Sequence, residues 1–88
     1  MAGVGLRVGL LGAGAMGEAL AGGLLAAGTP TADVVAAEPD AARRDAVAQR
    51  LGIRVVDDGA EVVRASDLVV LAVKPGVVGA ALDGLGAL

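Results

Sequence analysis

The chain contains no cysteine, histidine, phenylalanine, tyrosine or tryptophan. Without cysteine or histidine, these residues cannot form disulfides, thiolate or imidazole metal sites, a cysteine nucleophile or a histidine-based catalytic triad. Without aromatic rings they lack the stacking platforms on which single-stranded nucleic acids bind. The formal net charge of −3 also gives no basic surface for a phosphate backbone. We therefore expect neither a metal site nor a nucleic-acid partner.

Small and aliphatic residues make up most of what is present. Hydrophobic residues account for 56% of the 88 residues and charged residues for 19%, a composition that favours a folded core over disorder. A chain of this length forms one domain at most and buries only about 60–65% of its unfolded surface, so its stability is expected to be marginal. Its core must be built from many small, close contacts.

The apolar run over residues 8–27 is long enough to cross a bilayer, and it also raises the possibility of a signal peptide. Glu18 interrupts its middle, where a carboxylate costs about 2.5–3.5 kcal/mol on insertion scales. The run is broken by Gly12, Gly14, Gly17, Gly22 and Gly23. Arg7 is the only basic residue before it, whereas a signal peptide has a continuous apolar centre behind a basic start. We expect a cytoplasmic protein with no membrane partner, which the absence of cysteine fits.

Residues 6–11 have the pattern of a strand buried on both faces, and a glycine cluster follows them. From residue 16 the apolar spacing becomes that of an amphipathic helix, with Glu18 on the opposite side and Gly28 as the left-handed cap. The face predicted to lie on the sheet comprises Met16, Ala19, Leu20, Gly23, Leu24 and Ala27.

The remaining sequence continues this alternation of strand and helix. Pro39 and Asp40 mark a turn into a helix that ends near Leu51, with Gly52 as its cap. Further strands are predicted over residues 33–37, 53–56 and 67–73, and further helices over residues 59–65 and from residue 77 to 85. Short connections of this kind predict the α/β class, a Rossmann-like doubly wound parallel sheet. A complete fold needs more strands, so residues 1–88 are interpreted as a truncated, amino-terminal portion of such a domain.

The glycine cluster has the G-x-G-x-x-G spacing that binds dinucleotides when it joins a strand to a helix. Here Gly12 would allow the tight turn, Gly14 the approach of the backbone to a pyrophosphate, and Gly17 the close packing of the helix on the sheet. Backbone N–H groups at the helix start would bind the phosphates with help from the helix dipole. The alternative is a glycine-rich turn with a structural role only. The candidate phosphate-binding residues are Gly12, Ala13, Gly14, Ala15, Met16 and Gly17.

Glu38 ends the second predicted strand, 21 positions after Gly17, where the fingerprint requires an acidic residue that binds the ribose hydroxyls. A carboxylate there would repel a 2′-phosphate, so among the nicotinamide cofactors NAD(P)H it favours NADH. Arg43 and Arg44 open the following helix and are within reach of a cofactor phosphate. The preferred interpretation is simpler, an exposed i, i+4 pair between Asp40 and Arg44.

The end of the fourth predicted strand also lies on the path of such a cofactor. It comprises Ala72, Val73, Lys74 and Pro75, in which the proline fixes a turn. Lys74 would contribute through its backbone, through its charge, or only as a solvated side chain.

These motifs resemble the amino-terminal domain of the pyrroline-5-carboxylate reductases. The resemblance covers essentially the whole chain and rests on residues 8–20 with their Met-Gly-Glu-Ala-Leu continuation, on Gly23-Leu24-Leu25, and on Ser66-Asp67 leading into the Ala-Val-Lys-Pro segment. It implies hydride transfer from a reduced nicotinamide to the small molecule 1-pyrroline-5-carboxylate, giving L-proline, with no metal. It places residues 72–75 at the nicotinamide end of the cofactor. In that family a carboxyl-terminal helical domain, absent here, binds the substrate and forms the dimer. The isolated chain is therefore expected to be inactive and the longer protein to be a homo-oligomer.

Two positions depart from the family pattern. Gly59 stands where family members often have an asparagine, and Pro39 stands where many have an arginine. Both changes concern nucleotide contacts rather than the fold. Two other functions stay open: another NAD(P)-dependent dehydrogenase of the 3-hydroxyacid type, and a non-catalytic nucleotide-binding module.

Overall fold

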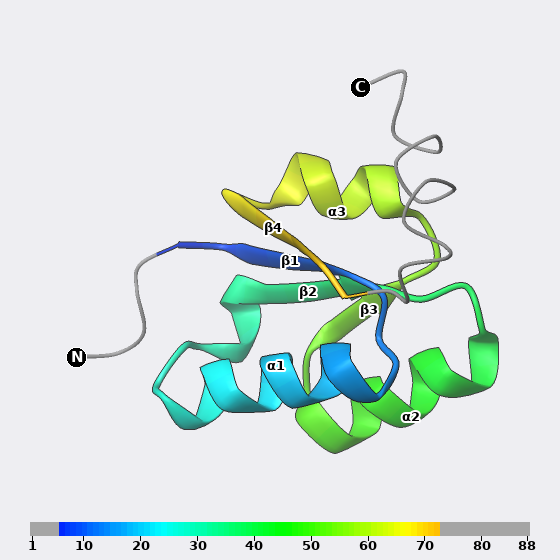
Figure 1. Ribbon diagram of the computed structural model, residues 1–88, viewed down its shortest axis with the longest axis horizontal. Coiled ribbons are helices and arrows are strands. Elements are labelled where there is room, and N and C mark those ends of the chain that lie inside the picture. Colours follow the sequence, from blue (N-terminus) through cyan, green and yellow to red (C-terminus); the bar gives the residue numbers. More distant parts are fainter. Residues whose placement is uncertain (1–5, 73–88) are drawn as a thin grey trace.

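The computed structural model describes residues 6–72, which form a parallel four-stranded sheet with helices on both faces (Figure 1). The strand order is β3-β2-β1-β4. Because all neighbouring pairs are parallel, the carboxyl ends of the strands lie at one edge of the sheet. The strands are β1 (Val8–Leu11), β2 (Val34–Ala37), β3 (Arg54–Val56) and β4 (Leu68–Leu71).

The helices that connect the strands lie on both faces of the sheet. Helices α1 (Ala15–Ala26) and α2 (Ala41–Leu51) cover one face, and α3 (Gly59–Ala65) covers the other after the chain crosses from β3 to β4 (Figure 1). A short 3-10 turn, Thr31–Asp33, replaces the first residue of the predicted second strand. The Rossmann-like α/β fold is confirmed. The predicted helix from residue 77 and the last residue of the fourth predicted strand lie outside the described residues.

Local sequence signals begin and end these helices. The Asp40 side chain accepts a hydrogen bond from the backbone N–H of Arg43 at 2.8 Å and so caps α2. Gly28 and Gly52 follow α1 and α2 with φ angles of 105° and 69°, which only glycine adopts without strain. The predicted caps are therefore confirmed.

The central strand β1 is buried on both faces. Leu10 packs with the α1 and α2 side of the sheet, whereas Leu11 packs with Val62 of α3. A Cβ on Gly9 would stand 2.6 Å from Cγ1 of Val62 and 2.2 Å from Oγ of Ser66. The absence of a side chain at Gly9 thus allows α3 to approach β1 closely. The core of this chain without aromatic residues is filled by small and aliphatic side chains.

The predicted face of α1 is wrong. Met16 is 62% exposed and Leu20 42% exposed, whereas Gly17 and Ala21 are the buried residues of this helix. The helix is apolar almost all round, so the spacing of apolar residues fits more than one face. The contact is decided by the position at which the backbone can come closest to the sheet, and that position is Gly17.

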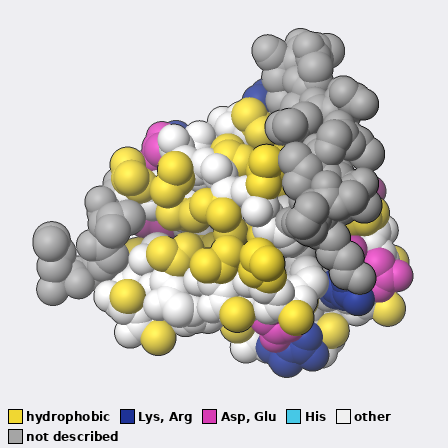
Figure 2. Space-filling model, in the orientation of Figure 1, with side chains coloured by type: hydrophobic (Ala, Val, Ile, Leu, Met, Phe, Trp, Pro, Cys, Tyr) yellow, Lys and Arg dark blue, Asp and Glu magenta, His cyan; other side chains and the backbone are white. Residues whose placement is uncertain are grey.

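Hydrophobic side chains gather on one face of the molecule, over β4 and the neighbouring part of α1 (Figure 2). In β4, the exposed large hydrophobic residues are Leu68 at 49% and Leu71 at 38%. Among residues 6–72, no helix is both long and apolar enough to span a membrane.

Candidate dinucleotide-binding site

The turn that follows β1 leaves the sheet between the ends of β2 and β4, the two strands that flank β1. The backbone N–H of Gly12 donates to the carbonyl of Ala37 at 2.9 Å, and that of Ala72 donates to the carbonyl of Leu11 at 2.9 Å. Gly12 then turns the chain with a φ of 109°. The turn therefore lies where the strand order passes from β1–β2 to β1–β4, the place where ligands bind in open α/β sheets.

Gly17 brings the first turn of α1 against this loop. A Cβ on Gly17 would stand 2.2 Å from the carbonyl oxygen of Gly12 and 3.4 Å from Cβ of Ala72. Since the nearest of these atoms belongs to backbone, a side chain at this position would force the helix away from the loop. Gly12 and Gly17 thus have the structural roles that the spacing predicts.

Gly14 is the N-cap of α1, and no side chain of residues 6–72 hydrogen-bonds to this end of the helix. The first backbone N–H groups of a helix have no partner within it, and the helix dipole adds partial positive charge there. A Cβ on Gly14 would meet only one atom of the described residues within 4 Å, Nη1 of Arg43 at 3.6 Å. Gly14 therefore leaves a space beside free N–H donors, and an arginine borders that space.

Glu38 connects this loop to the end of β2. It is only 6% exposed, and its carboxylate accepts from the backbone N–H of Ala13 at 3.1 Å and from that of Asp40 at 3.0 Å. Each carboxylate oxygen has further acceptor capacity beyond these single bonds. The structure thus places a fixed carboxylate beside the glycine turn, at the position predicted for the ribose.

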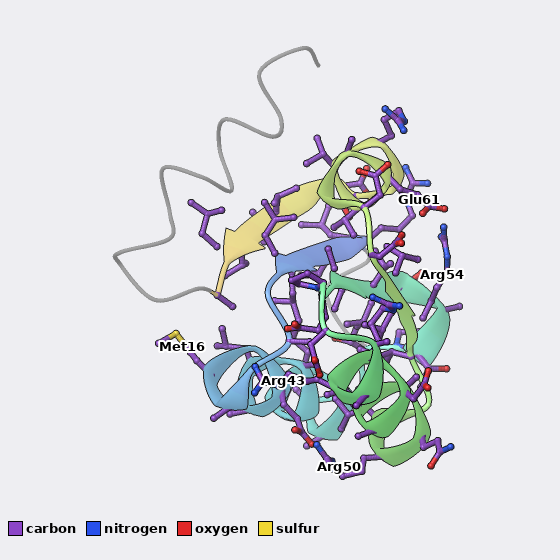
Figure 3. The ribbon with its side chains drawn as sticks, turned by 90° about the vertical axis from the view of Figure 1, so that its right-hand side faces the viewer. Met16, Arg43, Arg50, Arg54 and Glu61 are labelled. Carbon is purple, nitrogen blue, oxygen red and sulfur yellow. The ribbon has the colours of Figure 1, made fainter. Side chains whose placement is uncertain are left out.

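The two arginines at the start of α2, Arg43 and Arg44, differ in their contacts. Arg44 does not pair with Asp40: its Nη1 donates to the carbonyl oxygens of Glu38 at 2.9 Å and Pro39 at 3.0 Å. The exposed Asp40–Arg44 pair is therefore wrong, because the Asp40 carboxylate caps the helix and Arg44 bonds backbone carbonyls at the end of β2. Arg43 extends from α2 toward the first turn of α1, where Met16 also lies (Figure 3). Sequence spacing alone gave no reason to separate these two arginines.

At the fourth strand, Ala72 is 6% exposed and lies against the glycine turn. Val73, Lys74 and Pro75 lie outside the described residues. Their predicted contacts with the cofactor stay predictions.

At the opposite edge of the sheet, Arg7 and Asp67 join the beginnings of β1 and β4. The Asp67 carboxylate accepts from the backbone N–H of Arg7 at 3.0 Å and from its guanidinium at 3.3 Å. These hydrogen bonds, the side-chain one first, lower the pKa of Asp67. The sequence analysis missed this pair, since nothing in the pattern places residues 60 positions apart side by side.

The glycine turn fits a dinucleotide on the evidence of its own geometry. The loop and helix pack closely at Gly12 and Gly17, and the position at Gly14 is open. A carboxylate lies at the end of the neighbouring strand. Together these features define a dinucleotide-binding domain of the Rossmann type. The chain belongs to the family described as NADP oxidoreductase, coenzyme F420-dependent, whose family model matches residues 7–88.

Among solved structures, the chain is similar to a pyrroline-5-carboxylate reductase from Coxiella burnetii. The two share 23% sequence identity with a TM-score of 0.86, and the match covers 93% of this chain. The chain spans 30% of the length of that reductase. The resemblance inferred from the motifs therefore holds for the fold. A search of curated protein sequences gave no significant match.

Proposed function

We propose that this chain supplies the cofactor-binding half of an enzyme that reduces 1-pyrroline-5-carboxylate to L-proline with NAD(P)H. The observation that carries the cofactor is the open position at Gly14, beside the start of α1. The substrate is supported by the Met-Gly-Glu-Ala-Leu and Ala-Val-Lys-Pro segments and by the fold shared with the reductase from Coxiella burnetii.

The reaction adds a hydride to the carbon of a C=N bond and a proton to its nitrogen, so that the imine becomes a secondary amine. A bound reduced nicotinamide would supply the hydride. The residues described here bind and orient: the backbone N–H groups of Ala15 and Met16 would hold the pyrophosphate, and Glu38 would accept from the adenosine ribose. Residues 72–75 would lie along the nicotinamide.

We further propose that the cofactor is NADH rather than NADPH. The carboxylate of Glu38 is held by two backbone N–H groups, so a 2′-phosphate would be placed beside a fixed negative charge. Two unit charges 4 Å apart interact by about 4 kcal/mol at an effective dielectric constant near 20. Arg44 does not offset this charge by pairing with the Glu38 carboxylate. Its guanidinium donates to the backbone carbonyls of Glu38 and Pro39.

The first test is the substitution Gly14→Val. The position has an ordinary extended backbone, with φ −73° and ψ −166°, and a space beside it, so the fold should tolerate a side chain. That side chain would occupy the place proposed for the pyrophosphate, and we expect NADH binding to be abolished. Calorimetric titration of the parent and the variant measures this, with circular dichroism as the check of folding. Unchanged affinity in a folded variant would mean that the turn has a structural role only.

The second test compares NADH and NADPH with the parent chain and with Glu38→Ser. We expect the parent to bind NADH more tightly and the serine variant to lose most of this preference, because the repelling charge is gone. Tighter binding of NADPH by the parent, unaffected by the substitution, would show that Glu38 does not bind the ribose.

The substrate itself needs the longer protein, expressed from the whole reading frame. The family description also names coenzyme F420, so both 1-pyrroline-5-carboxylate and oxidised F420 should be offered as hydride acceptors. Oxidation of NADH that depends on 1-pyrroline-5-carboxylate supports the proposal. Turnover with F420 alone, or with a 3-hydroxyacid in the reverse direction, would assign a different oxidoreductase. Cofactor binding without any turnover would favour the non-catalytic module.

A further inference from the structure

Arg43 is placed at the candidate site by the way α2 begins. It lies in the first turn of the helix, and its backbone N–H is held by the cap residue Asp40. Side chains in an α-helix lean toward the helix N-terminus, and this end of α2 lies at the edge where β1 and β2 end. The guanidinium therefore reaches back over the glycine turn, where its Nη1 lies 3.6 Å from the Cβ position of Gly14 (Figure 3).

Most other arginines of residues 6–72 already have partners. Arg7, Arg50 and Arg54 form ion pairs with Asp67, Glu18 and Glu61. Arg44 donates to backbone carbonyls, whereas Arg43 and Arg64 make no side-chain hydrogen bond or ion pair within the described part of the chain. Of these last two, Arg43 alone borders the glycine turn.

We propose that Arg43 binds the pyrophosphate of the dinucleotide from the side opposite the N-terminus of α1. We call this contact the clamp; it does not distinguish NADH from NADPH. This inference rests on the proposed cofactor site. An oxyanion in the space beside Gly14 would lie between the free N–H groups of α1 and the guanidinium, whose planar fork matches a phosphate. In this proposal the ribose hydroxyls bind at Glu38, on the other side of the turn. Arg43 therefore contacts the pyrophosphate, which NADH and NADPH have in common.

The experiment titrates the 88-residue chain with NADH and with NADPH, using the parent, Arg43→Ala and Arg43→Lys. We expect Arg43→Ala to weaken both cofactors by the same factor, about tenfold, as for loss of a hydrogen bond to a charged group. Arg43→Lys, which keeps the charge but not the fork, should recover part of this loss. The slope of affinity against salt concentration should fall in the alanine variant, because a phosphate contact is removed.

Arg64→Ala is the matched control. It removes another exposed positive charge, in the last turn of α3, that has no partner among residues 6–72. It should leave both affinities within the error of the parent. Circular dichroism and urea midpoints should agree for all four proteins.

The alternative outcomes separate the clamp from the proposed function. Loss of affinity for NADPH alone would overturn the pyrophosphate assignment and make Arg43 a reader of the 2′-phosphate. Unchanged affinity in Arg43→Ala, with binding abolished in Gly14→Val, would overturn the clamp and leave the cofactor site intact. A parent chain that is folded and binds neither cofactor would overturn the site itself.

Discussion

At the residue scale, the glycines of this chain have different structural roles, although each has only a hydrogen atom as its side chain. Gly12 needs a positive φ, Gly17 needs the absence of a Cβ, and Gly14 leaves a space for a ligand. Gly22 and Gly23, in the middle of α1, have nothing within 4 Å of their Cβ positions among the described residues. These differences separate positions that a substitution would damage from positions that it would improve.

We predict that Gly17→Ala destabilises the chain by about 1–3 kcal/mol, the usual cost of overpacking, because its Cβ would stand 2.2 Å from the carbonyl oxygen of Gly12. Urea unfolding followed by circular dichroism measures this. The control is Gly22→Ala, in the same helix but with free space around it, which should stabilise the chain by about 0.5–1 kcal/mol. Equal effects of the two substitutions would contradict the close packing at Gly17.

Residue patterns predicted the glycine turn and Glu38 but not the surroundings of either. The strand-to-helix context and the spacing to Glu38 are local properties of the chain, so they can be read along it. The Glu38 carboxylate accepts from the backbone N–H of Ala13, and Arg44 donates to two backbone carbonyls. Both bonds depend on which side chains lie close to backbone groups without a backbone partner. That proximity is settled only in three dimensions.

At the scale of elements, a bidentate ion pair joins the two helices on one face of the sheet. Nε and Nη2 of Arg50 in α2 donate to the carboxylate of Glu18 in α1 at 2.6 and 2.7 Å. The hydrogen bond from Arg50 lowers the pKa of Glu18 from its usual value of 4.5. Glu18 was predicted only as the polar side of α1, and its partner 32 positions away could not be read from periodicity.

We predict a pH-dependent contribution from this pair. Because the pKa of Glu18 is lower in the folded state, the stabilisation is fully present above the unfolded pKa and is lost as the pH falls through the folded pKa. Glu18→Gln should therefore lower the urea midpoint slightly at pH 7, and parent and variant should converge as the solution is acidified through the folded pKa of Glu18, below 4.5. A gap that persists in acid would show that the glutamine acts through packing instead of charge.

At the scale of the whole molecule, alternation of strands and helices was enough to predict the topology. Parallel strands with short connections admit few arrangements, and right-handed crossovers select among them. The orientation of α1 was not predictable, since a helix that is apolar all round has no single face that its sequence marks for burial. What decided it was close approach at one glycine, a property of the packed molecule.

We predict that the 88-residue chain alone binds the cofactor but does not reduce 1-pyrroline-5-carboxylate. The site residues that the structure describes are those proposed to bind the dinucleotide, and the chain spans 30% of the reductase it matches. Monitoring NADH oxidation with the isolated chain and with the longer protein at equal concentration checks this. Turnover by the isolated chain comparable to that of the longer protein would contradict it.

The pairing of β1 with two distant segments has a consequence for synthesis on the ribosome. Val8 pairs with Val34 on one side and with Leu68 on the other, so the second pairing closes a much longer loop. Loop closure costs about 0.6 kcal/mol more for each doubling of length, which favours the β1–β2 pairing first. The turn at Gly12 and the carboxylate of Glu38 are both in place at that stage, whereas Ala72 has not yet left the ribosome. A nascent chain would thus acquire the adenosine end of its cofactor site well before the nicotinamide end.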